Sequence, residues 1–449
     1  MVKKIINAAG INKTVLFILM NRVWTVLGGI GSIYFLTKYL TPEVQGYYYT
    51  FSSLITLQLF IELGLTNAIM HFVSHEMASL SWKPEGVLTG DAHAKKRMKS
   101  ILNFATLWFG VGSVLLITLL LPVGVFLLKK GISASAVENL DIIEPWTILV
   151  CATAVNMIIT GGMSILEGTG EVQEISKIRI YKSMFSTLTV WIVLVLGGNL
   201  YALAISSMVM GLISVVFLLN KYHNFFIDIF RFKSSLPGIS WRNEIWPFQW
   251  RIAVSWASGF LTFSLFNPIL LIYHGPVAAG KMGMSLQIIM ALNNAAMSWI
   301  DSKVPTFGGL IALKKIGELN KHFFKALRQS FAFLLLTIVF LLLLLSYLSA
   351  TGSQYAERVI PLPYFCLLTI ICLANHIVFS EASYLRAYKG EPFMIVSLIN
   401  GITTAILAST LIPNLGTAGA VFSYAFGAIL VSLGAGSVIF YNKYKKELE

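Results

Sequence analysis

The chain has 449 residues, of which 56% are hydrophobic and only 12% are charged. A soluble domain carries about 25% charged residues, so this composition excludes an ordinary soluble protein and indicates a membrane protein. The net charge of +13 lies in loops between long apolar runs. It forms no basic domain with interleaved aromatic residues, so we expect no nucleic-acid partner.

Apolar segments of about 20 residues recur along the chain, each long enough to cross the ~30 Å hydrocarbon core as a helix. The runs are continuous rather than alternating, which favours helices over the strands of a membrane barrel. The sequence therefore predicts an all-α integral membrane protein with twelve transmembrane helices. In chain order these lie near 15–37, 45–71, 101–127, 146–166, 180–198, 200–219, 250–273, 280–303, 329–349, 362–385, 393–412 and 418–440.

The basic residues predict the orientation of these helices. Most of the 33 Lys and Arg residues fall in segments on the side of the N-terminus, and loops rich in Lys and Arg remain in the cytoplasm. Because twelve is an even number, both termini are then cytoplasmic. We expect a multi-pass protein of the cell inner (plasma) membrane.

Two stretches of similar sequence follow the first and the seventh predicted helix, namely TKYLTPEVQGYYYTF and LIYHGPVAAGKMGMS. Pro42 aligns with Pro276 and Gly46 with Gly280 at the same offset. Matched residues in corresponding loops indicate an internal repeat of six helices, and repeated halves around a central cavity are typical of secondary transporters.

A second pair of matching loops supports the repeat, because Gly170–Glu171 corresponds to Gly390–Glu391. The predicted organisation is a six-helix lobe at 1–225, an amphipathic cytoplasmic linker at 226–244 and a second six-helix lobe at 245–449.

Four segments at helix ends and in loops carry a resemblance to a known family: LQLFIELGLTNAIMHFVSHEMA, ILEGTGEVQEISKIR, WRNEIWPFQWRIAVSW and SYLRAYKGEPF. Here the chain resembles the polysaccharide-biosynthesis branch of the MOP superfamily, which contains Wzx-type O-antigen flippases beside MATE exporters and lipid II flippases. The resemblance implies a MATE-like fold of two pseudo-symmetric lobes around a cationic cavity. It also implies a flippase for a polyprenyl-diphosphate-linked oligosaccharide, such as an O-antigen or another surface-polysaccharide repeat unit.

Three ionisable residues inside predicted spans are the main candidates for a transport site. Arg22 lies within the first helix and Glu62 lies at a similar depth in the second. A charge at mid-helix is costly and normally faces protein or a water-filled cavity. An arginine grips phosphate oxygens with two parallel hydrogen bonds, so Arg22 is expected to bind the diphosphate, and Arg251, its counterpart in the repeat, to do the same.

Glu62 is expected to hold Arg22 or a coupling proton when the substrate is absent. Two alternatives stay open for these residues: Arg22 and Glu62 form a buried structural ion pair, or Arg251 extends to the membrane interface. The expected partners are the lipid-linked oligosaccharide, membrane lipids, H⁺ or Na⁺ as the coupling ion, and other polysaccharide-assembly proteins.

Three further residues are weaker candidates for an ion or substrate site. Asp301 and Glu381 lie near the predicted cytoplasmic ends of their helices, where solvated interfacial pairs are the simpler interpretation. A histidine titrates near neutral pH when unperturbed, but a hydrogen-bonded packing role is the better explanation of His376.

The sequence contains no GxxxxGK[ST], HExxH, GxSxG or CxxC motif, so we expect no enzyme activity, no cofactor and no metal site. Two other classes stay open: a MATE-like exporter of small molecules or drugs, and a membrane glycan polymerase or ligase. Two arginines and one glutamate inside the spans disfavour a cationic drug, and short predicted external loops disfavour a polymerase.

Overall fold

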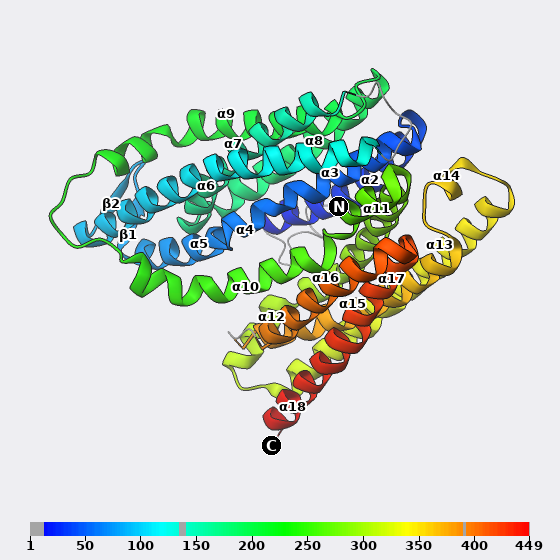
Figure 1. Ribbon diagram of the computed structural model, residues 1–449. Coiled ribbons are helices and arrows are strands. Elements are labelled where there is room, and N and C mark those ends of the chain that lie inside the picture. The colour runs from blue at the N-terminus through cyan, green and yellow to red at the C-terminus, as the bar shows by residue number, and fades with distance from the viewer. Residues whose placement is uncertain (1–12, 134–140, 389–391, 449) are drawn as a thin grey trace, which may run out of the picture. The chain divides into compact units, whose positions relative to one another are not determined.

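The computed structural model describes residues 13–133, 141–388 and 392–448, and nearly all of them are helical (Figure 1). Within these ranges ten helices are long and apolar enough to cross a membrane, or eleven if the bent pair Pro42–Glu62 and Leu65–Ser79 is one span. The predicted all-α membrane fold is therefore confirmed. The orientation of the termini stays a prediction, and the predicted match at Gly390–Glu391 lies outside the described residues.

One long helical stretch, Gln249–Ile311, accounts for the difference from the twelve predicted helices. It has 63 residues and covers two of the predicted spans, 250–273 and 280–303. A straight helix of that length would measure about 95 Å, roughly three times the hydrocarbon thickness. Its backbone leaves the helical conformation at Gly275, where φ is 77°, so the stretch is not a single crossing.

The described residues form two compact units, and the divisions that fall within the described residues lie inside helices. These are α2 (Lys13–Tyr39), the short helix η1 (Thr56–Gln58), α6 (Ala92–Ser133) and α10 (Trp246–Phe263). The first unit takes in the described residues of Met1–Phe35, Leu57–Phe126 and Leu140–Ala253, and the second those of Leu36–Thr56, Leu127–Asn139 and Val254–Glu449.

The first unit contains, besides its parts of those helices, α4 (Leu59–Glu62), α5 (Leu65–Glu76), η2 (Met77–Ser79), β1 (Leu80–Trp82), β2 (Leu88–Gly90), α7 (Ile143–Gly168), α8 (Val172–Val195), α9 (Tyr201–Arg231) and the π-helical turn η3 (Trp241–Ile245). The strands β1 and β2 form an antiparallel hairpin in which Ser81 pairs with Thr89. Asp91 then accepts a hydrogen bond from the backbone N–H of Ala94 at 3.0 Å, which caps the first turn of α6.

The second unit contains α3 (Pro42–Ile55), α11 (Phe266–Asp301), α12 (Val304–Ala312), α13 (Ile316–Ala350), α14 (Gln354–Glu357), α15 (Leu362–Arg386), α16 (Met394–Leu415), α17 (Thr417–Ala425), the π-helix η4 (Phe426–Ala435) and α18 (Gly436–Leu448). The hydroxyl of Thr41 accepts from the N–H of Val44 and Pro42 occupies the first turn, so the sequence itself starts α3.

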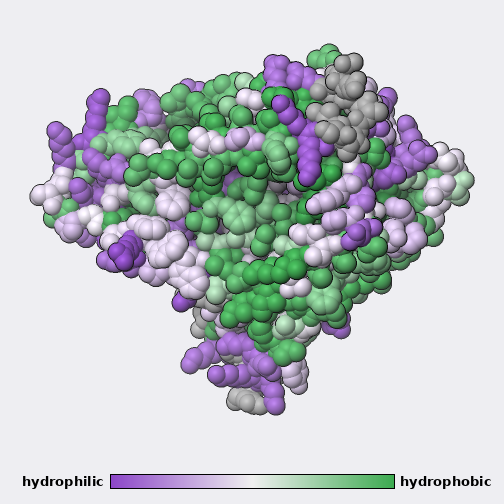
Figure 2. Space-filling model, in the orientation of Figure 1, coloured by the Kyte–Doolittle hydropathy of each residue, from purple (hydrophilic) through white to green (hydrophobic). Residues whose placement is uncertain are grey.

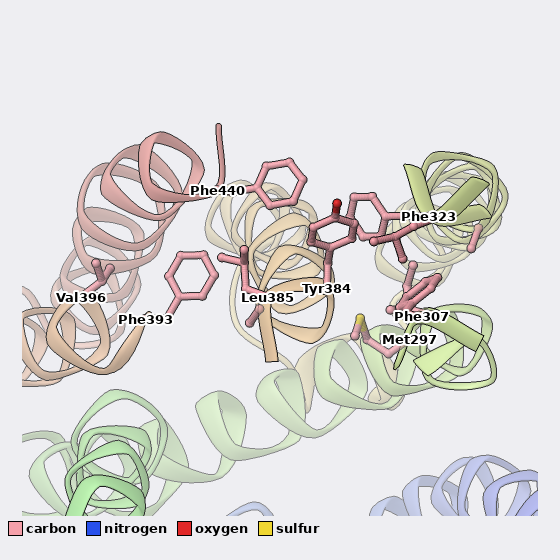
Figure 3. Close-up of a cluster of buried hydrophobic side chains, with 12 residues drawn as sticks. Met297, Phe307, Phe323, Tyr384, Leu385, Phe393, Val396 and Phe440 are labelled. Carbon is pink, nitrogen blue, oxygen red and sulfur yellow. The ribbon is translucent and has the colours of Figure 1, made fainter. Parts of the chain in front are cut away.

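Aromatic side chains fill the interior of the second unit near α18. Tyr384 lies between Phe323 and Phe440, with ring centroids 4.8 and 5.3 Å apart (Figure 3). Its hydroxyl donates to Asn320 at 2.7 Å, so the polar end of this buried ring is satisfied. The outer surface of the helices around this cluster is mostly hydrophobic, whereas hydrophilic residues gather at the end of α18 (Figure 2). That distribution fits helices surrounded by lipid.

Candidate functional site

The second membrane span is broken directly after Glu62. Helix α4 ends at Glu62, Leu63 and Gly64 both have positive φ (47° and 64°), and α5 begins at Leu65. The two segments of the span are bent by 43°. Leucine rarely adopts positive φ, and such strain costs about 1–3 kcal/mol and concentrates at functional sites. Interrupted helices also form the binding sites of many transporters.

Three contacts stabilise the broken span around Glu62. The indole Nε1 of Trp108 donates to the carbonyl oxygen of Ile61 at 3.0 Å. The hydroxyl of Thr66 donates to the half-buried carboxylate of Glu62 at 2.6 Å. A Cβ on Gly64 would overlap the side chain of Ile252. The start of α10 therefore packs directly on the break.

This packing brings two of the predicted site residues, Glu62 and Arg251, into one region of the first unit. Arg251 is the neighbour of Ile252, is exposed, and has its guanidinium 5.8 Å from the ring centre of Trp250. Arg22 is half-buried within α2. Glu62 accepts a hydrogen bond from Thr66. Its pairing with Arg22 stays a prediction.

An aromatic cluster ties the start of α10 to α6 beside the break. It consists of Phe104 and Trp108 of α6, Trp241 of η3 and Trp246 of α10. The ring of Trp241 lies 5.6 Å from those of Phe104 and Trp108 and 5.1 Å from that of Trp246. The Nε1 of Trp241 also donates to the fully buried Gln249 at 2.9 Å. Four large rings therefore fix the helix that carries Arg251.

An ionic group lies near the beginning of α6. Arg97 donates to Glu76 at 2.7 Å and to Glu244 at 2.6 Å. The side chain of Glu76 is only 7% exposed, so it depends on this partner. The hydrogen bond from Arg97, and a second one from the backbone N–H of Ser240, hold the pKa of Glu244 below its usual value.

Three lysines of α6 hold the end of α9 and the irregular segment that follows it. Lys99 donates to the carbonyl oxygens of Phe230 and Phe232 at 2.7 and 2.8 Å. Lys96 donates to the carbonyl oxygen of Ser234 at 2.9 Å, and Lys95 lies 2.8 Å from Asp228. Ammonium groups at a helix C-terminus satisfy its unpaired carbonyls and oppose its negative dipole. The beginning of the predicted linker, 226–244, is therefore bound to α6 by these lysine side chains.

In the second unit, the two stretches that align in the sequence are in contact. A Cβ on Gly46 would overlap the carbonyl of Pro276, and a Cβ on Gly280 would lie 2.9 Å from the backbone nitrogen of Gly46. Glycine lets the backbones of α3 and α11 approach this closely. One turn further, the hydroxyl of Tyr49 donates to Gln287. The aligned residues thus form one helix crossing.

Arg358 reinforces this crossing from the loop that precedes α15. Its guanidinium donates to Gln45 at 3.2 Å and to the carbonyl oxygens of Leu40 and Thr37, at the end of α2, at 2.6 and 3.1 Å. Gln45 in turn donates to the carbonyl oxygen of Gly280 at 3.1 Å. A single side chain therefore joins the end of α2, the start of α3 and α11.

A small polar pocket of about 190 Å³ lies in the second unit, between α10, α15, α16 and η4. Asn400 donates to Thr262 across it at 3.4 Å. Because η4 is a π-helix, and such segments are frequent at functional sites, the pocket is a second candidate. Its polar lining residues are Ser255, Ser258, Thr262, Asn375, Arg386, Ser397, Asn400 and Ser432.

The weaker candidates lie in the second unit. The carboxylate of Glu381 is 6% exposed and accepts from Ser437 at 3.1 Å. His376 is fully buried and hydrogen-bonded to Ser330 at 2.9 Å and to Asn293 at 3.3 Å, an arrangement that fits a packing role. Asp301 is the last residue of α11.

Sequence reasoning missed the polar pocket and the break, although both left a signal. Ser255, Ser258 and Thr262 recur at three- and four-residue spacing and so share one face of a predicted apolar helix. Gly64 inside a predicted span is the signal for the break. The positive φ of Leu63 has no such signal, since leucine ordinarily avoids it.

No family model matches the sequence, and no curated protein matches it. Solved structures do match over nearly the whole chain. An inward-facing multidrug resistance MATE family transporter of the MOP superfamily aligns with a TM-score of 0.66 at 13% identity, covering 96% of each chain. The lipid II flippase MurJ, in an inward closed conformation, aligns with a TM-score of 0.63 at 13% identity, covering 96% of this chain and 87% of MurJ. An outward-facing MATE transporter of the MOP superfamily gives 0.59 at 14% identity, covering 97% of each chain.

These matches define the class of fold. The chain is a multi-pass membrane protein with the fold that MATE transporters and MurJ share, as predicted. At this level of identity the likeness is one of fold, and it does not distinguish between the substrates of these proteins.

Proposed function

We propose that the chain is a flippase of the inner membrane. It moves a polyprenyl-diphosphate-linked oligosaccharide, an O-antigen or another surface-polysaccharide repeat unit, from the cytoplasmic to the outer leaflet by alternating access. The observation that carries the proposal is the broken span at Glu62, where strained backbone, a half-buried carboxylate and the helix bearing Arg251 come together.

The residues of the first unit suit a carrier of anionic headgroups. Arg251 and Arg22 supply the positive charge that a diphosphate requires, and each can make paired hydrogen bonds to its oxygens. Glu62 competes for that charge in the empty carrier. Protonation of Glu62 releases it, so one residue couples headgroup binding to a proton gradient.

The six-helix halves 1–225 and 245–449 are proposed to rock against one another during transport, and other polysaccharide-assembly proteins supply and consume the glycan. The polar pocket of the second unit is a second candidate for ion coupling. Its hydroxyl and amide oxygens are ligands for Na⁺, whereas the carboxylate of Glu62 binds a proton. Dependence of transport on external Na⁺ that disappears in Asn400→Leu would assign coupling to the pocket instead.

The test is the leaflet in which the lipid-linked glycan accumulates when the chromosomal copy is replaced by variants, read with a lectin or glycosidase added to intact spheroplasts. Arg22→Glu and Glu62→Gln are expected to leave most of the glycan inaccessible from outside. The matched control is Glu318→Gln, which removes an exposed carboxylate one turn from its partner Lys315, where an ion pair contributes little.

Two results would contradict the proposal. One is full external access of the glycan in Arg22→Glu cells that contain normal amounts of protein. The other is undisturbed glycan export together with loss of efflux of a cationic dye in Glu62→Gln cells, which would indicate a MATE-like drug exporter.

A further inference from the structure

An apolar groove runs along the first unit between α6, α7 and α9, and Glu62, Arg22 and Arg251 are not among its lining residues. Its volume is about 410 Å³, and an adjoining depression of about 610 Å³ shares Thr106 and Phe230 with it. The hydroxyl of Thr106 is already bonded to the carbonyl oxygen of Leu102. Apart from Asn103 in the depression and His223 in the groove, the remaining walls are apolar, so an occupant that fits them is a hydrocarbon chain.

Two consecutive glycines of α7, Gly161 and Gly162, line the groove. A Cβ on Gly161 would overlap the ring of Phe109, whereas a Cβ on Gly162 would fit at ordinary van der Waals distance, 3.5 Å from the ring of Phe226 and 3.8 Å from Leu218. Glycine inside a helix costs about 1 kcal/mol relative to alanine. Gly161 is explained by packing, but no close neighbour requires a glycine at 162, and what it provides is the space of the groove.

One end of the groove carries positive charge. The ammonium of Lys99 lies 2.7 Å from the carbonyl oxygen of Phe230, whose side chain lines both cavities, and the exposed Arg231 is the next residue. Lys99 donates two hydrogen bonds to carbonyl oxygens, and an ammonium has three to give. His223 also lines the groove, and the acidic Asp228 on the same helix is held by Lys95 at 2.8 Å.

We propose that this groove binds one acyl chain of an anionic membrane phospholipid, with the headgroup phosphate beside Lys99 and Arg231. The hydrocarbon walls select a chain, and the cationic end selects the charge of the headgroup. The site lies apart from Glu62 and the arginines of the proposed transport site, so it is a lipid site in addition to the substrate site. It stands whether or not the transported substrate is an oligosaccharide.

Native mass spectrometry of the full-length purified protein tests the site, using phosphatidylglycerol and phosphatidylcholine with identical acyl chains. The wild type is expected to retain phosphatidylglycerol in preference to phosphatidylcholine. Gly162→Leu fills the groove and should lower phosphatidylglycerol retention about tenfold. Arg231→Gln removes an exposed cation and keeps the lysine contacts that hold the end of α9, so it should reduce the preference between the two lipids while leaving the groove open.

The matched control is Gly29→Leu, the same substitution on α2, where an added Cβ meets nothing within 4 Å, and it should bind lipid as the wild type does. If Gly162→Leu does not yield folded protein, Ile158→Trp fills the groove from a residue that is 44% exposed. Wild-type retention in the folded groove-filling variant, or equal retention of both lipids by the wild type, overturns the proposal. Displacement of phosphatidylglycerol by a polyprenyl phosphate, abolished in Gly162→Leu, would assign the groove to the substrate's tail instead.

Discussion

Gly46 and Pro276 lie in backbone contact, because a Cβ on Gly46 would overlap the carbonyl of Pro276. One residue comes from the first copy of the sequence repeat and the other from the second. Helix α3 belongs to the second unit although it lies early in the chain. The two stretches aligned in the sequence therefore form an interface within that unit, and the internal duplication stays a prediction.

Gly46→Ala is expected to destabilise the protein, since backbone atoms cannot move aside as a flexible side chain can. Overpacking of this kind costs typically about 1–3 kcal/mol, and a lower thermal unfolding midpoint in detergent measures it. Gly29→Ala is the control, because its new methyl group meets nothing within 4 Å and alanine favours the helix. Equal midpoints for the two variants would contradict the close crossing.

Trp108→Phe is expected to destabilise the local structure of the broken span beside Glu62. The variant keeps an aromatic ring against Trp241 but removes the Nε1 donor to the carbonyl of Ile61. A carbonyl left without its partner costs about 1–3 kcal/mol where it is buried. Faster hydrogen exchange at residues 59–66 in the variant measures the effect, and Phe104→Leu, which removes a ring from the same cluster but no hydrogen bond, is the comparison. Unchanged exchange in Trp108→Phe would show that the indole does not support the break.

The pair of Arg97 and Glu244 predicts a dependence of stability on pH. The hydrogen bond from Arg97 keeps the pKa of Glu244 below its usual value in the folded protein. A carboxylate with a lowered folded pKa stabilises the protein above its unfolded pKa, about 4.3, and this contribution is lost as the pH falls through the folded value.

Glu244→Gln should therefore lower the unfolding midpoint at pH 7, and the difference from the wild type should shrink as the pH is lowered from 5 to 3. A difference that stays constant over this range would mean that the charge of Glu244 contributes nothing. Arg97→Met should be more damaging than Glu244→Gln, because it also deprives Glu76 of its partner.

Arg358→Lys keeps the positive charge but is expected to loosen the crossing of α3 and α11. Burial lowers the pKa of Arg358, while the nearby Glu43 and Glu357 raise it, and the guanidinium stays ionised at neutral pH. It serves three acceptors at once, whereas a lysine ammonium is a single point that cannot span them. The measurement is thiol labelling of an introduced cysteine, Val44→Cys, at a position that is only 4% exposed; labelling should be slow with Arg358 and faster with Arg358→Lys. Equal labelling rates would contradict a joining role.

The fold was readable from the sequence because membrane spans are set by local composition and length, and both are properties of short segments. The predicted ends of α15, at 362 and 385, differ by at most one residue from Leu362–Arg386. The sequence also predicted two spans, 250–273 and 280–303, where the structure has one long helical stretch, Gln249–Ile311, that leaves the helical conformation at Gly275.

The candidate site was readable only in part. Charged residues in apolar spans stand out, which is how Arg22, Glu62 and Arg251 were found. Their partners do not, because Trp108 is 47 residues from Ile61 and Arg358 is 313 residues from Gln45. Such contacts depend on how helices pack, and no local pattern contains that information. Serines and asparagines are also common enough in membrane helices that the polar pocket became visible only once four helices were placed together.

The lysines at the start of α6 have a consequence for protease accessibility. The peptide bond after Lys233 is a trypsin site in an irregular segment, but the carbonyl oxygens of Phe232 and Ser234 on either side are held by Lys99 and Lys96. Cleavage requires a segment to unfold locally into an extended form. This bond should therefore resist trypsin in the folded protein and become a cleavage site once those lysines are replaced, so the connection between the two halves of the sequence behaves as part of the first unit rather than as a loose tether.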